Sequence, residues 1–413
     1  MRILAGKAAL LRVDELANRG SKLADLEPGV RKIVEDVHRN GDRALRAYAE
    51  KWDGLDRANG LRVADSELKA AWNAASPELR RAVGTALQNI RRFCEWQKPR
   101  EWRRTAGGIS LGQVVRPLDS VGCYVPGGRH PLVSTLMMTV VPAQVAGVRN
   151  IRVVSPNPGA EVFAAAYKLG VQDFFRVGGA QAIAALAYGT ETIPRVDKIV
   201  GPGNQFVTVA KKLVSFDCAI DFLAGPTEVV IVSHSGRAQF IASDLVAQAE
   251  HDPEAVPVFI TSSKRLAENV NRFVEEQASD NPTARKAASR KGAILIADTK
   301  RDAMAWANRI APEHITVDAK DVPSVQHAGS IFVGGYSAQA AGDYASGPNH
   351  VLPTGGSARF RGGLTVLDFV KIMTVQELSE RGLQRIGKTV AYLAEAEGLR
   401  AHARSIRVRC PNA

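Results

Sequence analysis

The chain has 413 residues, of which 45% are hydrophobic and 23% charged, and its formal net charge is +12. This length is enough for two or three domains with large buried cores, and the composition is ordinary for a soluble globular protein. The four cysteines (Cys94, Cys123, Cys218 and Cys410) include no Cys-x-x-Cys pair, which excludes a zinc-finger framework and argues against a disulfide scaffold. The first residues lack the apolar run of a signal peptide, so we expect a cytoplasmic protein.

In chain order, residues 1 to about 105 have a helical pattern, and the helical spacing within residues 30–52 is interrupted at Asn40-Gly41. The uncharged stretch 131–148 is nearly long enough to span a bilayer. It contains Ser134, Pro142 and Gln144, so we expect a buried helix followed by a turn, and no membrane partner.

From residue 121 onward, short apolar runs alternate with helical segments. The expected strands are residues 121–125, 151–154, 174–177, 198–200, 228–232, 256–260, 293–297, 314–317 and 330–333. This alternation predicts parallel sheets covered on both faces, and the number of strands predicts two doubly wound α/β domains. From residue 361 the pattern is again helical and ends in residues 383–397 and 401–404.

Glycine-rich loops follow several of the apolar strands, at residues 124–128, 177–181, 201–204 and 224–227. Binding sites in parallel sheets lie at the carboxyl ends of strands, where backbone N–H groups and helix N-termini suit a phosphate or a nicotinamide. Neither Gly-x-Gly-x-x-Gly nor a Walker A sequence is present, which argues against a P-loop nucleotidase.

The stretch 88–104 mixes aromatic and basic residues, a combination that can bind nucleic acid. Glu95 and Glu101 lie in the same stretch, and the chain has no run of five like charges. We therefore expect a helix end with a solvated basic face, and no nucleic-acid partner. A positive net charge also attracts anionic small molecules such as dinucleotides.

Three polar clusters interrupt the apolar pattern. Residues 342–354 combine Asp343 and His350 with turn-forming glycines and prolines, as expected of a rigid loop that directs side chains at a ligand. Gln248 and His251 lie three residues apart near the end of a predicted helix, where they can share a metal ion. A histidine there can instead interact with the terminal carbonyls of the helix.

The third cluster is Glu313-His314, at a corner between a helix and a strand. The two side chains there either line a cleft in separate acid–base roles or belong to an exposed turn. His402 follows a helix whose end carries Glu397.

Jointly, these motifs resemble the histidinol dehydrogenase family from about residue 25 to residue 409. The matching segments are residues 41–45, 124–128, 179–187, 200–204, 224–228, 248–251, 312–314 and 342–354. The resemblance implies two Rossmann-like doubly wound domains, small helical terminal extensions, and a homodimer with shared active sites. The implied boundaries are an N-terminal extension (1–20), a first domain (21–122 with 228–360), a second, NAD-contacting domain (123–227), and a C-terminal extension that reaches the partner subunit (361–413).

The resemblance also implies the site residues. Glu313 and His314 match the catalytic acid–base pair, and Tyr124, Gln181 and Asn204 match the NAD contacts. The zinc ligands, one ion per subunit, would be Gln248, His251, Asp343 and the partner subunit's His402. These ligands and the catalytic pair would also contact substrate, together with Thr227, His350 and Glu397.

The implied reaction is the zinc- and NAD-dependent four-electron oxidation of L-histidinol to L-histidine through L-histidinaldehyde, the last step of histidine biosynthesis. Two positions depart from the family pattern: Thr227 stands where serine is common, and Arg129-His130-Pro131 stands where smaller residues or lysine are usual. Relatives of the family oxidise other alcohols, so the alternative is a zinc- and NAD-dependent dehydrogenase of the same family that acts on another alcohol, such as a sulfonated diol. The segment 397–402 favours histidinol, because the family holds the substrate's polar ends there.

Overall fold

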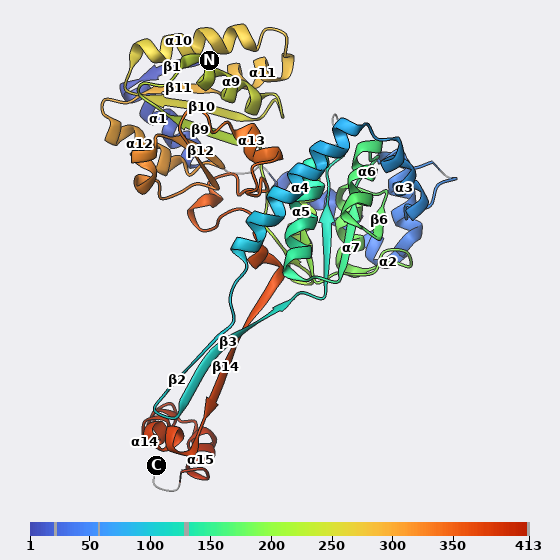
Figure 1. Cartoon of the computed structure of the whole chain (residues 1–413), viewed down its shortest axis with the longest axis vertical. Coiled ribbons are helices and arrows are strands. Elements are labelled where there is room, and N and C mark those ends of the chain that lie inside the picture. The colour runs from blue at the N-terminus through green and yellow to red at the C-terminus, as the bar shows by residue number, and fades with distance from the viewer. Residues whose placement is uncertain (20–22, 57, 128–131, 411–413) are drawn as a thin grey trace.

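The computed structural model describes residues 1–19, 23–56, 58–127 and 132–410. Figure 1 shows two globular α/β units side by side and a long arm that extends away from them and ends in two helices. Residues 128–131, which include the unusual Arg129-His130-Pro131 segment, lie outside the described residues.

The first unit is built on a six-stranded parallel sheet with the order β1-β11-β10-β9-β12-β13. Its strands are β1 (Arg2–Ala5), β11 (Ala293–Ile296), β10 (Val256–Thr261), β9 (Glu228–Val232), β12 (His314–Val317) and β13 (Ser330–Val333). Val229 and Ile231 of β9 pack into the core on one face, whereas Val230 and Val232 pack into the core on the other. This period of two, with both faces buried, explains why the strand is a continuous apolar run in the sequence.

Helices cover both faces of this sheet. One core includes residues of α1 (Gly6–Ala17) and α12 (Lys300–Ile310), and the opposite core includes residues of α9 (Ala238–Ala249) and α10 (Lys264–Gln277). Two further helices, α11 (Pro282–Arg290) and α13 (Gln339–Tyr344), contact α9.

The second unit is built on a five-stranded parallel sheet with the order β6-β5-β4-β7-β8. Its strands are β4 (Ser120–Tyr124), β5 (Asn150–Val154), β6 (Asp173–Phe175), β7 (Lys198–Val200) and β8 (Ala219–Ile220). The helices that connect them are α5 (Val133–Ala146), α6 (Ala160–Leu169), α7 (Gly179–Tyr188) and α8 (Gln205–Val214). Helix α5 is almost wholly buried, which confirms the buried helix expected in the uncharged stretch. No helix in the described part of the chain is long and apolar enough to cross a membrane.

The packing differs from the domain division expected from the sequence. Helices α2 (Glu27–Trp52), α3 (Asp65–Ala74) and α4 (Pro77–Gln97) contact α7, α6 and α5, so they belong to the five-stranded unit, not to the unit that contains residues 228–360. Residues 1–17 are an integral edge strand and helix of the six-stranded unit, because β1 pairs with β11. The expected break at Asn40-Gly41 is a kink within α2, where Gly41 has a φ of 52°.

The arm is an antiparallel sheet with the order β14-β3-β2, formed by β2 (Trp102–Ala106), β3 (Ile109–Pro117) and β14 (Val370–Leu378). The helical pattern expected up to residue 105 and again from residue 361 was therefore wrong for β2 and β14. Most of their residues are exposed, so neither strand shows the alternation that a half-buried strand has. The basic stretch 88–104 is divided between α4 and β2, and its Glu101 pairs with Arg116.

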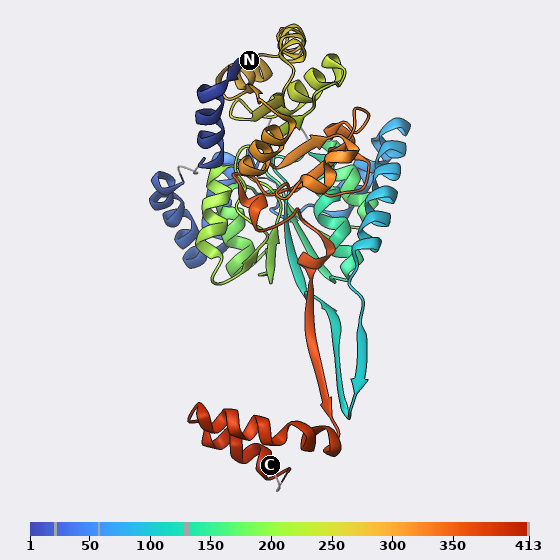
Figure 2. The ribbon, with the colours of Figure 1, turned by 90° about the vertical axis from the view of Figure 1, so that its left-hand side faces the viewer.

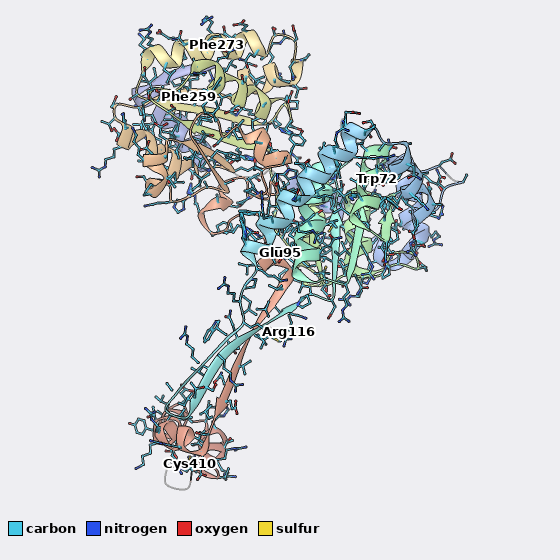
Figure 3. The ribbon with its side chains drawn as sticks, in the orientation of Figure 1. Trp72, Glu95, Arg116, Phe259, Phe273 and Cys410 are labelled. Atoms are coloured by element: carbon cyan, nitrogen blue, oxygen red, sulfur yellow. The ribbon has the colours of Figure 1, made fainter. Side chains whose placement is uncertain are left out.

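Two helices, α14 (Glu380–Ala396) and α15 (Arg400–Arg407), pack against each other at the far end of the arm. Figure 2, turned by 90°, also shows them well separated from both globular units. In Figure 3, Arg116 lies along the arm and Cys410 lies at its end, whereas Phe259 lies in the six-stranded unit.

Candidate active site

A cavity of about 580 Å³ lies between the two globular units. The six-stranded unit contributes Thr227, Gln248, His251, Glu313, His314, Asp343 and His350, and the five-stranded unit contributes Thr135 and the loop Pro202–Phe206. The loop leaves the carboxyl end of β7, as expected. Thr227 and Glu313, in contrast, immediately precede β9 and β12, so this half of the site lies at the amino ends of its strands.

Glu313 is almost fully buried, and its carboxylate is held in place by two donors. The Thr227 hydroxyl donates to Oε2 at 2.6 Å, and the backbone N–H of Glu228 donates to the same oxygen at 2.8 Å. The Gln248 amide nitrogen in turn donates to the Thr227 hydroxyl oxygen. Three of the expected site residues therefore form one hydrogen-bonded chain, with a carboxylate at its end.

His314, the first residue of β12, is buried beside Glu313. Its Nδ1 lies 3.1 Å from the backbone carbonyl of Glu228, which can only accept, so Nδ1 is the donor. Its Nε2 is buried 3.6 Å from Asp343 Oδ1 and has no hydrogen-bond partner among the described residues. Burial alone would lower the pKa of His314, but the carboxylates of Glu313 and Asp343 outweigh it and raise the pKa to about 10.

Asp343 lies in the last turn of the short helix α13, at the start of the polar segment 342–354. Burial opposes ionisation, but His314 lowers the pKa of this carboxyl group. The Asp343 carbonyl accepts from Nδ1 of His350 at 2.7 Å, and Nε2 of His350 lies 3.2 Å from the Thr135 hydroxyl of α5. Burial lowers the pKa of His350, which favours a neutral ring that links the two units across the cavity.

Gln248 and His251 are brought to the same cavity by the end of α9. Gln248 is buried in the last turn, whereas His251 is exposed just beyond the helix, with its backbone N–H bonded to the Gln248 carbonyl. Within the described ranges, no three His, Cys, Asp or Glu side chains meet as a metal-binding cluster. Of the four expected zinc ligands, three line this cavity: the imidazole of His251, the carboxylate of Asp343 and the amide of Gln248.

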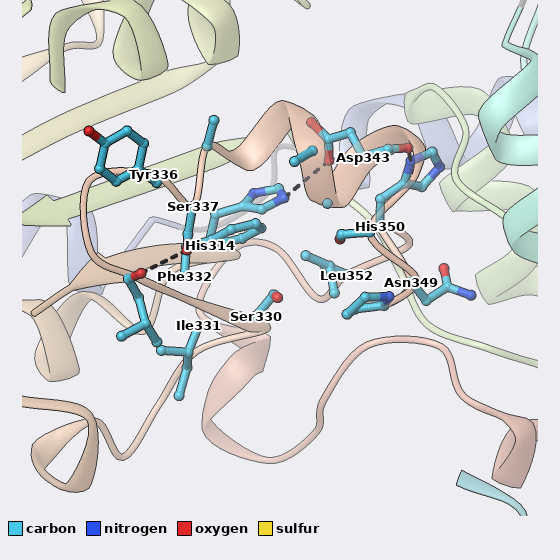
Figure 4. A pocket seen from close by; sticks show the side chains of 16 residues that line it. His314, Ser330, Ile331, Phe332, Tyr336, Ser337, Asp343, Asn349, His350 and Leu352 are labelled. Carbon is cyan, nitrogen blue, oxygen red and sulfur yellow. Dashed lines mark hydrogen bonds and ion pairs between the residues drawn. The ribbon is translucent and has the colours of Figure 1, made fainter. Parts of the chain in front are cut away.

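A second cavity, of about 370 Å³, adjoins the first. His314, Asp343, His350 and Leu352 line both cavities and form the wall between them. Figure 4 shows the contact between His314 and Asp343 in this second cavity, and Tyr336 is a further lining residue. The cavity extends along β13, the edge strand of the six-stranded sheet.

The three expected NAD contacts fall in two places. Asn204 lines the main cavity and caps α8 by accepting from the Val207 N–H at 3.1 Å. Tyr124 and Gln181 are buried near each other under the loop that opens α7. Gly179 N–H donates to the Tyr124 hydroxyl, and the Gln181 amide donates to Asp53. These two residues shape the loop from below and do not line the cavity.

Glu397 and His402 are not near the other site residues within one chain. Glu397 caps the end of α14 and His402 lies on α15, at the far end of the arm. A single chain therefore assembles the acid–base pair, Thr227, Gln248, His251, Asp343 and His350, but neither of these two residues.

Charged residues that are buried or half-buried around the site were missed in the sequence. They are Arg19, Asp53, Lys211, Asp221 and Glu228, each of which bonds a backbone group or a charge near the site. The sequence could have indicated these residues by a charged side chain within an apolar run. Examples are Glu228, directly before Val-Val-Ile-Val, and Lys211 within Val207–Val214. Such charges are almost always paired when buried, but the sequence does not say with which partner.

The fold and the site together define an α/β protein with two parallel-sheet units and an acid–base site in the cavity between them. The chain matches the family model for histidinol dehydrogenase over residues 16–410. A relative from Methanosarcina barkeri named histidinol dehydrogenase is 45% identical over 411 residues, covering 96% of this chain and 95% of that protein.

A second relative of that name, from Aquifex aeolicus, is 44% identical over 408 residues, or 96% of each chain. The crystal structure of histidinol dehydrogenase from Elizabethkingia anophelis has a TM-score of 0.94 and 34% identity, covering 100% of this chain and 98% of that one. The chain therefore belongs to the histidinol dehydrogenase family.

Proposed function

We propose that this protein oxidises L-histidinol to L-histidine through L-histidinaldehyde, with NAD as the oxidant and one zinc ion per site. The observation that carries the proposal is the buried pair Glu313 and His314, held in fixed orientations by the backbone of Glu228. The pair opens onto a cavity whose lining also includes five side chains expected to bind metal or substrate: Thr227, Gln248, His251, Asp343 and His350. Family membership supports the choice of substrate.

His314 acts as the base in the alcohol step. Because Nδ1 is fixed as a donor to Glu228, Nε2 is the atom that takes the hydroxyl proton. The ring must first be neutral, and its raised pKa reflects two nearby carboxylates. A cation held by Asp343 would weaken that attraction and would lower the pKa of His314 toward the range that a general base needs.

Glu313 acts in the second half, in which water adds to the aldehyde. Thr227 and the Glu228 N–H both bond Oε2, which leaves the other carboxylate oxygen to accept a proton from water. None of the four cysteines lines the cavity, and all four are buried. The proposed aldehyde oxidation therefore proceeds through a hydrate and not through a thiohemiacetal.

The donor set in the cavity fits a zinc ion. An imidazole, a carboxylate and an amide oxygen are available from His251, Asp343 and Gln248. Bound zinc would supply a fixed positive charge that orients the substrate, and bound NAD would accept hydride from the carbinol carbon. Asn204 and the loop that begins at Gly201 form the cavity wall on the proposed NAD side.

The arm supports the proposal that the protein is a homodimer with shared sites. His402 and Glu397 are carried far from their own cavity, and the arm and its helices expose large apolar side chains. These include Trp102, Leu111, Ile372, Met373, Tyr392, Leu393 and Val408. Exposed apolar surface on this scale is typical of an interface between chains. A two-fold dimer would place one chain's His402 at the other chain's metal site.

The test is the stoichiometry of purified protein with histidinol and NAD, with and without zinc. We expect two NADH per histidine formed, and loss of turnover after zinc removal that zinc restores. One NADH with release of the aldehyde would contradict the four-electron reaction. A screen that includes sulfonated diols distinguishes the alternative, because a protein that oxidises those alcohols and leaves histidinol untouched is a dehydrogenase of another substrate.

A further inference from the structure

A fully buried ion pair lies in the five-stranded unit, away from Glu313 and His314. Lys211 is on α8 and Asp221 follows β8, and their side chains are 3% and 1% exposed. Lys211 Nζ and Asp221 Oδ1 are in direct contact. Removing two charges from water is unfavourable, and apolar pairs of similar size are often at least as stabilising. The position of this pair therefore has to be explained by what else it binds.

The pair binds both polar backbone groups of Gly201. The Gly201 N–H donates to Asp221 Oδ2 at 2.8 Å, and Lys211 Nζ donates to the Gly201 carbonyl at 2.8 Å. Gly201 has a φ of 113°, and a Cβ there would collide with the carbonyl oxygen of Tyr124. The ion pair thus fixes one buried residue in a backbone conformation that only glycine adopts readily.

Gly201 connects β7 to the loop that lines the cavity. Pro202, Gly203 and Asn204 follow it directly, and the Asn204 side chain begins α8. Asp221 also precedes a second lining loop, since residues 224–227 line the cavity. Its Oδ1 accepts from the Phe222 N–H at 2.6 Å, which fixes the start of the segment that leads to this loop. One ion pair therefore joins the two loops that form this wall.

We infer that Lys211 and Asp221 are positioning residues that hold the loop 201–204 in the shape that binds the dinucleotide. This inference rests on the proposed function, in which NAD is bound at this wall. Neither side chain lines the cavity, so the pair acts through Gly201 and Asn204 and not by touching the cofactor.

The first test replaces both charges, as Lys211→Met with Asp221→Leu, so that no uncompensated charge is left buried. The matched control is Lys212→Met, the neighbouring lysine, which is exposed and pairs with Glu27. With zinc-loaded enzyme and saturating histidinol, we expect the KM for NAD to rise about tenfold or more while kcat changes less than about threefold. The control should match the wild type.

The second test measures amide hydrogen exchange in the peptide that contains residues 201–205, without substrate or cofactor. We expect faster exchange in the double variant and none of this change in Lys212→Met, because the anchoring bonds to Gly201 are lost. If the apolar pair does not fold, Lys211→Gln with Asp221→Asn takes its place with the same expected directions, since neutral bonds are weaker than charge-assisted ones.

An unchanged KM for NAD in a folded double variant overturns the inference, and so does unchanged exchange of the loop, even if the melting temperature falls. If the wild type itself does not use NAD, the proposed function fails. The exchange measurement then decides on its own whether Lys211 and Asp221 fix the loop.

Discussion

Glu228 and His314 are joined by the bond between the Glu228 carbonyl and Nδ1 of the imidazole, at 3.1 Å. The N–H of the same glutamate donates to Glu313, so one residue of β9 orients both members of the acid–base pair. Its own side chain is buried and held by the Arg19 guanidinium and by the Gly355 N–H. The orientation of the pair thus depends on Arg19, which follows α1 in the N-terminal segment.

Replacing Arg19 with methionine leaves the Glu228 carboxylate buried without its cation. Loss of one partner of such a pair typically costs about 3–5 kcal/mol, and we expect the free energy of unfolding to fall by that order. Arg31→Met is the matched control, because Arg31 forms an exposed pair with Glu27 and should change stability by less than about 1 kcal/mol. Chemical denaturation measures both. Equal effects of the two substitutions would show that Arg19 does not anchor Glu228.

The two members of the acid–base pair should have separable roles. Glu313→Gln should slow oxidation of added histidinaldehyde more than oxidation of histidinol, because only the aldehyde step needs an activated water. His314→Asn should slow the alcohol step, and loss of a general base typically costs about a hundredfold to ten-thousandfold. Single-turnover measurements with each substrate distinguish the steps. If both variants oxidise the aldehyde at the wild-type rate, the assignment of Glu313 is wrong.

The shared site can be tested with mixed dimers. His251→Ala and His402→Ala chains should each be inactive as homodimers, because each proposed metal site then lacks one ligand. In a mixed dimer one site has both defects and the other has none. Random pairing makes about half of the dimers mixed, so activity should recover to about a quarter of the wild-type level.

The mixed dimers are isolated with two affinity tags, and their zinc content is measured beside the activity. If His402 acted within its own chain, every site would retain one defect and neither zinc nor activity would return. Such a result would refute sharing of the site between chains.

Asp244 gives a pH dependence of stability that does not involve the acid–base pair. It lies on α9 one turn before Gln248, and burial raises its pKa from 3.8 to about 6. A raised carboxyl pKa stabilises the fold at low pH, and this contribution is lost as the pH rises through about 6, because the folded state must then bury a charge. Asp244→Asn removes the loss. Its melting temperature should therefore exceed that of the wild type by more at pH 8 than at pH 5, whereas an equal difference at both pH values would contradict this account.

Much of the fold was determined by the sequence alone. Strands buried on both faces must be continuous apolar runs, so each strand expected between residues 121 and 333 is present in the two parallel sheets within a few residues. The residues that line the main cavity were also recognisable, because polar side chains such as Glu313 and Gln248 interrupt apolar segments for a chemical reason. Their joint motifs pointed to the family to which the chain belongs.

Which elements pack together could be learned only from the three-dimensional structure. The apolar face of α2 must be buried against another element, but the sequence does not say in which of the two units. In the structure α2 packs against α7 of the five-stranded unit. Strand β14 has no sequence signal because most of its side chains are exposed, and its nine-residue pairing with β3 depends on backbone bonds that every residue can make. The partners of Glu228 and Lys211 were equally hidden, because a buried charge demands a counter-charge while its position in the chain leaves open which one.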